Sequence, residues 1–336
     1  MTDSILYKLR SGKPNKALDF TKNFASLLIP DCYYRAQLNK KLNKAKSRPD
    51  YEAMLDRVNY YCKIGSQWKI PDTDRAELGT TYLKYTGTFG NYHRKMFRTA
   101  YYFDQHDVTR YFPRTLRWNY CPGDVYFTPT EPTIVKSRLL TEDNSNSVLL
   151  KLDKLRHFMF VKDKKSFRDK ENRAIFRGKI RHSRIRTTFL ERYFHHPMFD
   201  CGVVGKNEGH PMEWMAEKKT INEHLDYKFI MAIEGNDVAS NLKWVMSSNS
   251  IAVMTRPTCE TWFMEGKLIP DYHYIEVADD FSDAEQKLNY YINHPDEAEA
   301  IIDNAHRYVE QFFDKEREEL LQLMVMQRYL QTSGQI

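Results

Sequence analysis

The segment YKFIMAIEGNDVASNLKWVMSSNSIAVM, residues 227–254, decides the fold class. An apolar run typical of a buried strand stops at Glu234-Gly235 and passes into small and polar residues. A helix-like stretch and a second apolar run, SIAVM, follow. Two buried strands joined through a helix are typical of a parallel sheet. The segment therefore predicts a strand–helix–strand unit whose first connection is an unusual polar loop.

Three further apolar runs extend this pattern: RAIFRG, FDCGVVG and YHYIEV (173–178, 199–205 and 272–277), each with helical sequence beside it. Strands that alternate with helices at this spacing favour a parallel sheet covered on both faces. We therefore expect a nucleotide-binding α/β domain in the second half of the chain.

The polar loop suits an anionic ligand. In open parallel sheets ligands bind beyond the carboxyl ends of the strands. Small residues would let the backbone approach a ligand, and the free N–H groups of a following helix would point at an anion such as a diphosphate. A plain strand–loop–helix connection, with Asn236 or Asp237 as the helix N-cap, has the same pattern, and the residues alone leave both open.

A second strand exit is rich in cations. The segment AIFRGKIRHSRIRTTF places five basic residues beyond a strand and before a helix expected near Thr187: Arg177, Lys179, Arg181, Arg184 and Arg186. Guanidinium groups bind phosphate oxygens in bidentate fashion, so this exit is a candidate phosphate clamp. No GxxxxGK[ST] and no GxGxxG is present, which disfavours P-loop and dinucleotide enzymes.

The first half is mainly helical in pattern. Residues 51–65 have the apolar spacing of an amphipathic helix, and short strands are expected at 124–128 and 133–137. Residues 146–161 are predicted to run from helix into strand. The C-terminal stretch predicts two or three helices, one starting at Pro295 and the last near Lys315. We see no linker, so the predicted boundary near residue 165 is compact.

Composition limits the class of protein. The 336 residues carry a formal net charge of +6, with basic clusters at 33–48, 160–173 and 176–186. These are either solvated faces or sites for a nucleotide, an anionic lipid or nucleic acid. The five scattered cysteines signal neither a disulfide framework nor a zinc site. The N-terminal residues lack the apolar region of a signal peptide, and no run would cross a bilayer, so a cytoplasmic protein is expected.

The motifs together resemble a known family. FRG, then FIMAIEGNDVASNLKWVMSSNSIAVM, then CETWFMEGKLIPDYHYIEV occur in an order and spacing similar to the family-90 glycosyltransferases. PTIVKSR and NSNSVLLKLDKLRHF resemble the bacterial lipopolysaccharide-biosynthesis branch, which is related to protein O-glucosyltransferases and capsule xylosyltransferases. The resemblance covers roughly residues 100–310.

The resemblance implies a GT-B-like α/β architecture, with two Rossmann-type domains facing across a cleft. It implies an acceptor-side domain over 1–165, a nucleotide-sugar domain over 166–315 and a C-terminal helix, 316–336, that packs back on the first domain. The donor would be a UDP-sugar, and no cofactor or metal is implied. The implied donor-binding residues are Arg177, Gly178, Arg181 or Arg184, Gly235, Asn236, Asp237, Val238, Ala239, Ser240, Asn241, Lys243 and Glu260.

The implied chemistry is an inverting displacement in which an acceptor hydroxyl attacks the anomeric carbon and UDP leaves. A carboxylate must take the hydroxyl proton, and cations or N–H donors must stabilise the diphosphate. By its place in the chain Glu131 is the first candidate base, Asp124 the second, and Asp104 or Asp107 the third.

The acceptor side is expected to include Lys136, Arg138 and Asn146, which would attract an anionic saccharide such as a lipopolysaccharide core. The basic helix at 33–48 would contact anionic lipid on the inner face of the inner membrane. Two other classes fit parts of the sequence: a nucleic-acid-binding protein, although no such motif is present, and an inactive saccharide-binding protein of the same fold.

Overall fold

The computed structural model describes residues 12–78, 83–91, 100–180 and 183–336. The chain forms two compact units, each described by itself. The parallel-sheet unit comprises Arg156–Thr258 and Glu265–Gln311, with 12–15 among the described N-terminal residues. The mixed-sheet unit comprises Lys16–Leu155, Cys259–Met264 and Phe312–Ile336. The division thus falls at 155/156, and residues 259–264 leave the second half of the chain to join the mixed-sheet unit.

The parallel-sheet unit contains five strands that all run in one direction. They are β7 (Glu171–Gly178), β8 (Phe199–Val203), β9 (Tyr227–Met231), β10 (Ile251–Met254) and β12 (Ile275–Glu276), in the order β12-β10-β9-β7-β8. The prediction of a parallel sheet is confirmed. The order reverses between β7 and β9, since β8 lies on one side of β7 and β9, β10 and β12 follow on the other.

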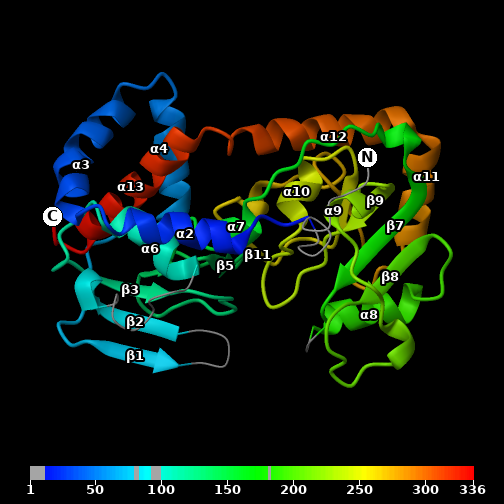
Figure 1. Ribbon diagram of the computed structural model, residues 1–336, viewed down its shortest axis with the longest axis horizontal. Coiled ribbons are helices and arrows are strands. Elements are labelled where there is room, and N and C mark those ends of the chain that lie inside the picture. Colours follow the sequence, from blue (N-terminus) through cyan, green and yellow to red (C-terminus); the bar gives the residue numbers. More distant parts are fainter. Residues whose placement is uncertain (1–11, 79–82, 92–99, 181–182) are drawn as a thin grey trace. The chain divides into compact units, whose positions relative to one another are not determined.

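Three helices connect these strands, as the alternating pattern predicts: α8 (Arg184–Tyr193), α9 (Ile221–His224) and α10 (Leu242–Met246). Helices α11 (Ala284–Asn293) and α12 (Pro295–Glu310) follow the last strand, and short 3-10 turns lie at Phe167–Asp169, Met212–Trp214 and Glu265–Lys267. Proline at the first position and Asp296 and Glu297 in the first turn explain why α12 starts where it does. A core that includes Phe189, Phe229 and Val253 is buried between sheet and helices (Figure 1).

The mixed-sheet unit contains a second five-stranded sheet, in the order β1-β2-β3-β4-β6. The strands are β1 (Arg75–Leu78), β2 (Leu83–Thr88), β3 (Arg117–Cys121), β4 (Thr133–Val135) and β6 (Ser147–Leu149). β1, β2 and β3 pair antiparallel, whereas β3, β4 and β6 pair parallel. A separate pair joins β5 (Ser137–Leu139) to β11 (Cys259–Thr261), the strand supplied by the returning segment.

Helices pack around this sheet: α2 (Lys16–Ser26), α3 (Asp31–Lys46), α4 (Tyr51–Tyr61), α6 (Ala100–Thr109) and α13 (Lys315–Thr332). α13 packs on α3, α4 and α6, as the red and blue ribbons of Figure 1 show. The returning segment is held by Trp262, which stacks on Tyr61 at 3.8 Å and donates to Glu318 at 2.7 Å.

Several sequence predictions need correction here. Residues 124–128 form no strand, and 146–161 start with strand β6 and continue into the short helix α7 (Lys154–His157) rather than the reverse. Short apolar runs such as these fit the pattern of a strand and that of a helix, and tertiary packing decides which of the two forms. Helix α8 begins at Arg184, three residues before the expected start.

Candidate functional site

The strand order of the parallel-sheet unit creates a switch point between β7 and β9. Where a doubly wound sheet reverses its order, the connections after the two neighbouring strands diverge and leave a crevice at their carboxyl ends. The connections here are 179–183, after β7, and 232–241, after β9. They are the two segments that the sequence singled out for an anion.

Arg186, on the first turn of α8, ties these two connections together. Its guanidinium donates to the carbonyl oxygens of Ile233 at 2.8 Å, Glu234 at 3.0 Å and Lys179 at 2.7 Å. Gly235 lies against this group, because a Cβ there would be 3.1 Å from the nearest guanidinium nitrogen. Arg186 therefore holds the two connections together and fixes the start of the glycine loop.

The connection after β10 is tied to the same edge through Glu234. Its carboxylate accepts from the backbone N–H of Thr258 at 3.1 Å and from the Thr258 hydroxyl, at 2.5 Å. Side chains thus join the connections that follow β7, β9 and β10. These hydrogen bonds hold the backbone of the candidate site in place.

Exposed cations line this edge. Lys179 and Arg184 follow β7 and Arg256 follows β10, and all three have exposed side chains. Among the described residues, neither guanidinium has a hydrogen-bond or ion-pair partner. An anion could bind here without breaking an existing ion pair. Arg181 lies outside the described residues.

The mixed-sheet unit has a second carboxyl edge with different chemistry. Asp124 follows β3 and Lys136 follows β4, and their charged groups pair at 2.7 Å. Because β3 and β4 are parallel neighbours, both residues lie at the carboxyl ends of their strands. The Lys136 side chain is 1% exposed and that of Asp124 is 19% exposed, so the carboxylate is the accessible partner.

Comparison with known proteins assigns the family. A family model described as Glycosyl transferase family 90 matches residues 148–332, more than half of the chain. The chain is also 37% identical to O-glucosyltransferase LpsA of Dichelobacter nodosus over 305 residues, which cover 90% of this chain and 91% of that protein. The chain belongs to glycosyltransferase family 90.

Family membership makes the protein a glycosyltransferase, with a sugar donor and a saccharide acceptor. In this glycosyltransferase some predicted site residues are accessible to a ligand, whereas others are buried or already paired with groups of the protein. Gly235, Asn236 and Ser240 are half-buried at the switch point, whereas Asp237, Val238 and Ala239 are buried. Neither Asn236 nor Asp237 is the N-cap of α10, which is Asn241, and the Asn241 amide donates to Met231 at 3.0 Å.

The Arg177 guanidinium, predicted to bind the donor, is paired within the protein in this structure. It donates to the carboxylate of Asp200 at 2.5 Å, to the Asp200 carbonyl at 2.9 Å and to the carbonyls of Phe176 and Glu217. Burial raises the pKa of Asp200, but hydrogen bonds from Tyr227 and Arg177 outweigh it and lower that pKa overall.

Gly178 has a structural role. A Cβ atom at this position would lie 2.6 Å from the ring of Phe176, so the site requires glycine.

Lys243 is also unavailable, contrary to the prediction that it binds the donor. Its side chain is fully buried in α10, and its ammonium pairs with Glu265. Helix α10 has only five residues, so its N-terminus is a weak site for an anion. Helix α8, with ten residues, is the longer helix at this edge of the sheet.

Glu260 presents no free carboxylate to a donor, a further correction. It lies on β11 in the mixed-sheet unit, where Oε1 accepts from Arg138 at 2.7 Å and Oε2 accepts from the hydroxyl of Tyr60. The side chains of Arg138 and Glu260 are both 0% exposed. Arg138 is therefore not an open acceptor-side cation, and Asn146 donates to the carbonyl of Pro129 at 3.1 Å.

The candidate bases occupy different edges. Glu131 precedes β4 and so lies at the amino end of that strand, where it pairs with Arg75 at 2.5 Å and accepts from Asn119 at 3.4 Å. Asp124 lies at the opposite, carboxyl edge. The sequence did not separate them, because both carboxylates occur in one irregular stretch between two strands.

The third candidates lie on α6. Asp104 is buried and accepts from the backbone N–H of Lys154 at 3.0 Å, and burial raises its pKa to about 7. Asp107 pairs with Lys154 at 3.1 Å. Both help to fix the start of α7 and are remote in the chain from the strand ends that carry Asp124 and Lys136.

Sequence reasoning missed Arg256 and the Glu234–Thr258 bridge. The pattern did contain a signal, since Arg256 follows the apolar run SIAVM after one residue, Thr255, and Lys179 likewise follows the run RAIFRG. In the described part of the chain, no group of three or more His, Cys, Asp or Glu side chains could hold a metal ion.

Proposed function

We propose that this protein is an inverting glycosyltransferase that transfers glucose from UDP-glucose to a saccharide of the lipopolysaccharide core type. The observation that carries the proposal is the switch point of the parallel sheet, where exposed, unpaired Arg184 and Arg256 lie beside the connections that Arg186 ties together. The similarity to O-glucosyltransferase LpsA of Dichelobacter nodosus supports a glucosyl donor.

In this proposal the diphosphate of the donor binds at the switch point. The half-buried positions Gly235, Asn236 and Ser240 would let the backbone approach the nucleotide, and the exposed Lys179, Arg184 and Arg256 would supply positive charge. These groups stabilise the negative charge that develops on the leaving UDP, which is the role metals have in other transferases. Metal-free binding is therefore part of the proposal.

Asp124 is the proposed base, in place of Glu131. An acceptor hydroxyl attacks the anomeric carbon, its proton passes to the Asp124 carboxylate, and the bond from that carbon to the diphosphate oxygen breaks to release UDP. The ammonium of Lys136, 2.7 Å from the Asp124 carboxylate, orients it for this transfer. A GT-B-like arrangement, with donor and acceptor on different units, belongs to the same proposal.

Thermal unfolding with UDP, with and without EDTA, tests the donor site. Bound UDP should stabilise the protein by about 2.7 kcal/mol at a hundredfold excess over its dissociation constant, and EDTA should leave this unchanged. Loss of the effect in EDTA contradicts metal-free binding.

Transfer from UDP-glucose and UDP-xylose to lipopolysaccharide core oligosaccharide then tests the reaction. Glucose transfer is expected, with the anomeric configuration inverted. UDP binding without transfer or hydrolysis would instead favour an inactive saccharide-binding protein, and binding of single-stranded oligonucleotides without UDP binding would favour a nucleic-acid partner.

A further inference from the structure

An exposed apolar tip joins helices α2 and α3. Leu28 is 84% exposed, Ile29 is 41% exposed and Tyr33 is 59% exposed, within six consecutive residues. Helix α2 has no buried residue, and it is anchored by Phe20 and Phe24, whose rings pack edge-on against Phe103. Single exposed apolar residues are ordinary, but a run of them at a loop tip is typical of an interaction surface.

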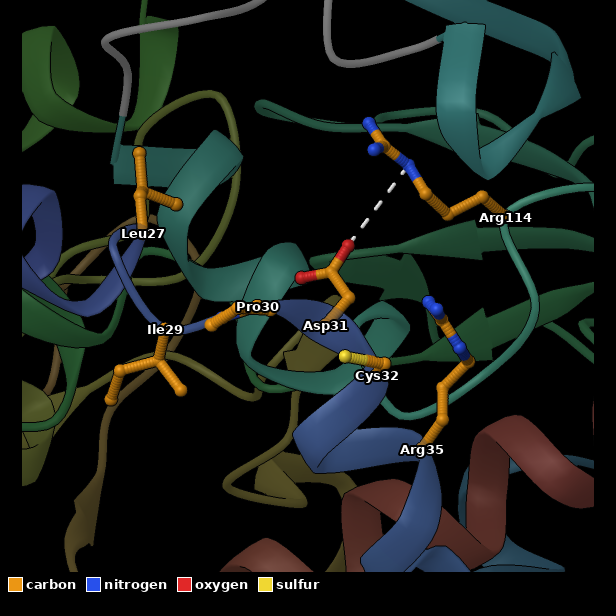
Figure 2. A pocket seen from close by; sticks show the side chains of 7 residues that line it. All are labelled: Leu27, Ile29, Pro30, Asp31, Cys32, Arg35 and Arg114. Atoms are coloured by element: carbon orange, nitrogen blue, oxygen red, sulfur yellow. Dashed lines mark ion pairs between the residues drawn. The ribbon is translucent and has the colours of Figure 1, made fainter.

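A pocket of about 340 Å³ opens beside this tip. Figure 2 shows the apolar side chains of Leu27 and Ile29 on one side and the guanidinium groups of Arg35 and Arg114 on the other. Arg114 is 56% exposed and lies 4.0 Å from Asp31, the acidic residue of the pocket. Among the described residues, Arg35 has no ion-pair or hydrogen-bond partner through its side chain. The pocket thus combines an apolar wall with positive charge.

The surrounding charge is strongly positive. Residues 16–48 contain eight lysines and arginines but only two acidic residues, Asp19 and Asp31. Not all of these cations are available, because Lys41, Lys44 and Arg48 pair with Glu319, Glu316 and Asp314 near the start of α13. Lys16, Lys22, Arg35, Lys40 and Lys46 are free of such pairs within the described chain. Arg35 therefore supplies available charge at the tip, and Lys40 and Lys46 supply it along the basic helix that the sequence indicated.

We propose that this tip, residues 27–35 with Arg114, docks on an anionic phospholipid bilayer. Leu28 and Ile29 enter the boundary between headgroups and acyl chains, and Arg35 and Arg114 bind headgroup phosphate. A bilayer offers both chemistries at one surface, apolar chains below a layer of negative charge. Nucleic acid offers negative charge but no apolar layer into which the side chain of Leu28 could insert. The structure contains no described helix long and apolar enough to cross a membrane, and the proposal needs none.

Vesicle co-sedimentation of the full chain tests the proposal without any sugar-transfer assay. The protein should sediment with vesicles of phosphatidylcholine and phosphatidylglycerol but much less with vesicles of phosphatidylcholine alone, and salt should reduce binding. The double variant R35A/R114A should lower the partition coefficient about 30-fold, which corresponds to about 1 kcal/mol for each basic residue. The variant L28S/I29S should lower it at least about tenfold.

A matched control replaces exposed residues elsewhere, Met212→Ser with Arg307→Ala. Met212 is 73% exposed and Arg307 is also exposed, so this variant removes one exposed apolar side chain and one exposed cation away from the tip, and it should bind vesicles like the wild type. Circular dichroism checks that each variant is folded. Equal loss in tip and control variants, or no preference of the wild type for anionic vesicles, overturns the proposal.

Two further outcomes would assign another occupant and also overturn it. If L28S/I29S turns a wild-type dimer into a monomer while vesicle binding is unchanged, the tip binds a second copy of the chain. If inorganic phosphate binds to Arg35 and Arg114 in titration calorimetry and vesicles do not compete, the pocket binds a free anion.

Discussion

The two units use their cations differently at the carboxyl ends of their strands. In the parallel-sheet unit, Arg184 and Arg256 are exposed and unpaired among the described residues. In the mixed-sheet unit, Lys136 pairs with Asp124 and Arg138 pairs with Glu260, and neither cation is accessible. A free cation at a strand end is available to an anionic ligand, whereas a buried, paired one orients a carboxylate or stabilises the fold. The donor phosphates should therefore depend on the first unit and proton transfer on the second.

The largest effect is expected from Asp124→Asn. The amide keeps the size of the side chain but removes its basicity, so sugar transfer should fall about 10²- to 10⁴-fold while UDP affinity stays nearly constant. Steady-state transfer assays, with UDP titration as the folding control, measure both quantities.

Glu131→Gln is the matched control, because it alters a carboxylate at the amino end of β4. Its turnover should stay near that of the wild type. If Glu131→Gln abolishes transfer and Asp124→Asn does not, the base lies at the amino end of β4. Proton transfer then does not depend on the pair of Asp124 and Lys136.

Breaking the buried pair on β5 and β11 should affect stability. Arg138→Met leaves the carboxylate of Glu260 buried beside Tyr60, so the free energy of unfolding should fall by about 3–5 kcal/mol. Urea unfolding followed by tryptophan fluorescence measures the change. The double variant R138M/E260L should recover most of the loss, and a single variant as stable as the wild type would show that this pair is dispensable.

The buried carboxyl group of Asp104, in the mixed-sheet unit, predicts how the stability of the protein depends on pH. Burial raises the pKa of Asp104 to about 7 from an ordinary value of 3.8. Below pH 4 the folded and unfolded chains both hold the proton. As pH rises toward 7 the unfolded chain loses it first, so the wild type loses stability over that range, by up to about 4 kcal/mol at neutral pH.

Asp104→Asn removes this ionisation and keeps an oxygen to accept from Lys154, so its stability relative to the wild type should increase from pH 4 to pH 7. Urea midpoints measured across this range provide the comparison. Parallel pH profiles for the two proteins would mean that Asp104 ionises normally in the folded state.

The sequence predicted the parallel sheet well because its strands are short apolar runs with helices between them, a pattern that burial on both faces imposes. The start of α12 at Pro295 and of α13 at Lys315 also followed from local capping chemistry. The mixed-sheet unit was harder, because β11 comes from a segment distant in the chain and pairs with β5 through long-range contacts.

Site residues were predicted less well for a related reason. A motif identifies residue types at a strand end, but the direction of a side chain depends on the neighbouring strand. Arg177 points to Asp200 on β8, and Lys243 points into the core toward Glu265, so neither pairing is visible in the local sequence. Arg184 and Arg256 stay available because no carboxylate among the described residues pairs with them.

The smallest effect should separate Arg177 from Arg184, seven positions later in the same segment. Arg184→Ala removes an exposed, unpaired guanidinium, so the free energy of unfolding should hardly change while UDP binding weakens by about 1.5–3 kcal/mol, the range for a hydrogen bond to a charged group. Arg177→Ala should do the opposite, because it removes the guanidinium that pairs with Asp200 and leaves the contacts with Tyr227 and Lys219: UDP affinity measured on the folded protein is kept and the urea midpoint falls. Calorimetric titration with UDP and urea unfolding of both variants give the two quantities independently. A loss of UDP affinity confined to Arg177→Ala would mean that its guanidinium leaves Asp200 when the donor binds, and the distinction between free and paired cations would then describe only the unliganded protein.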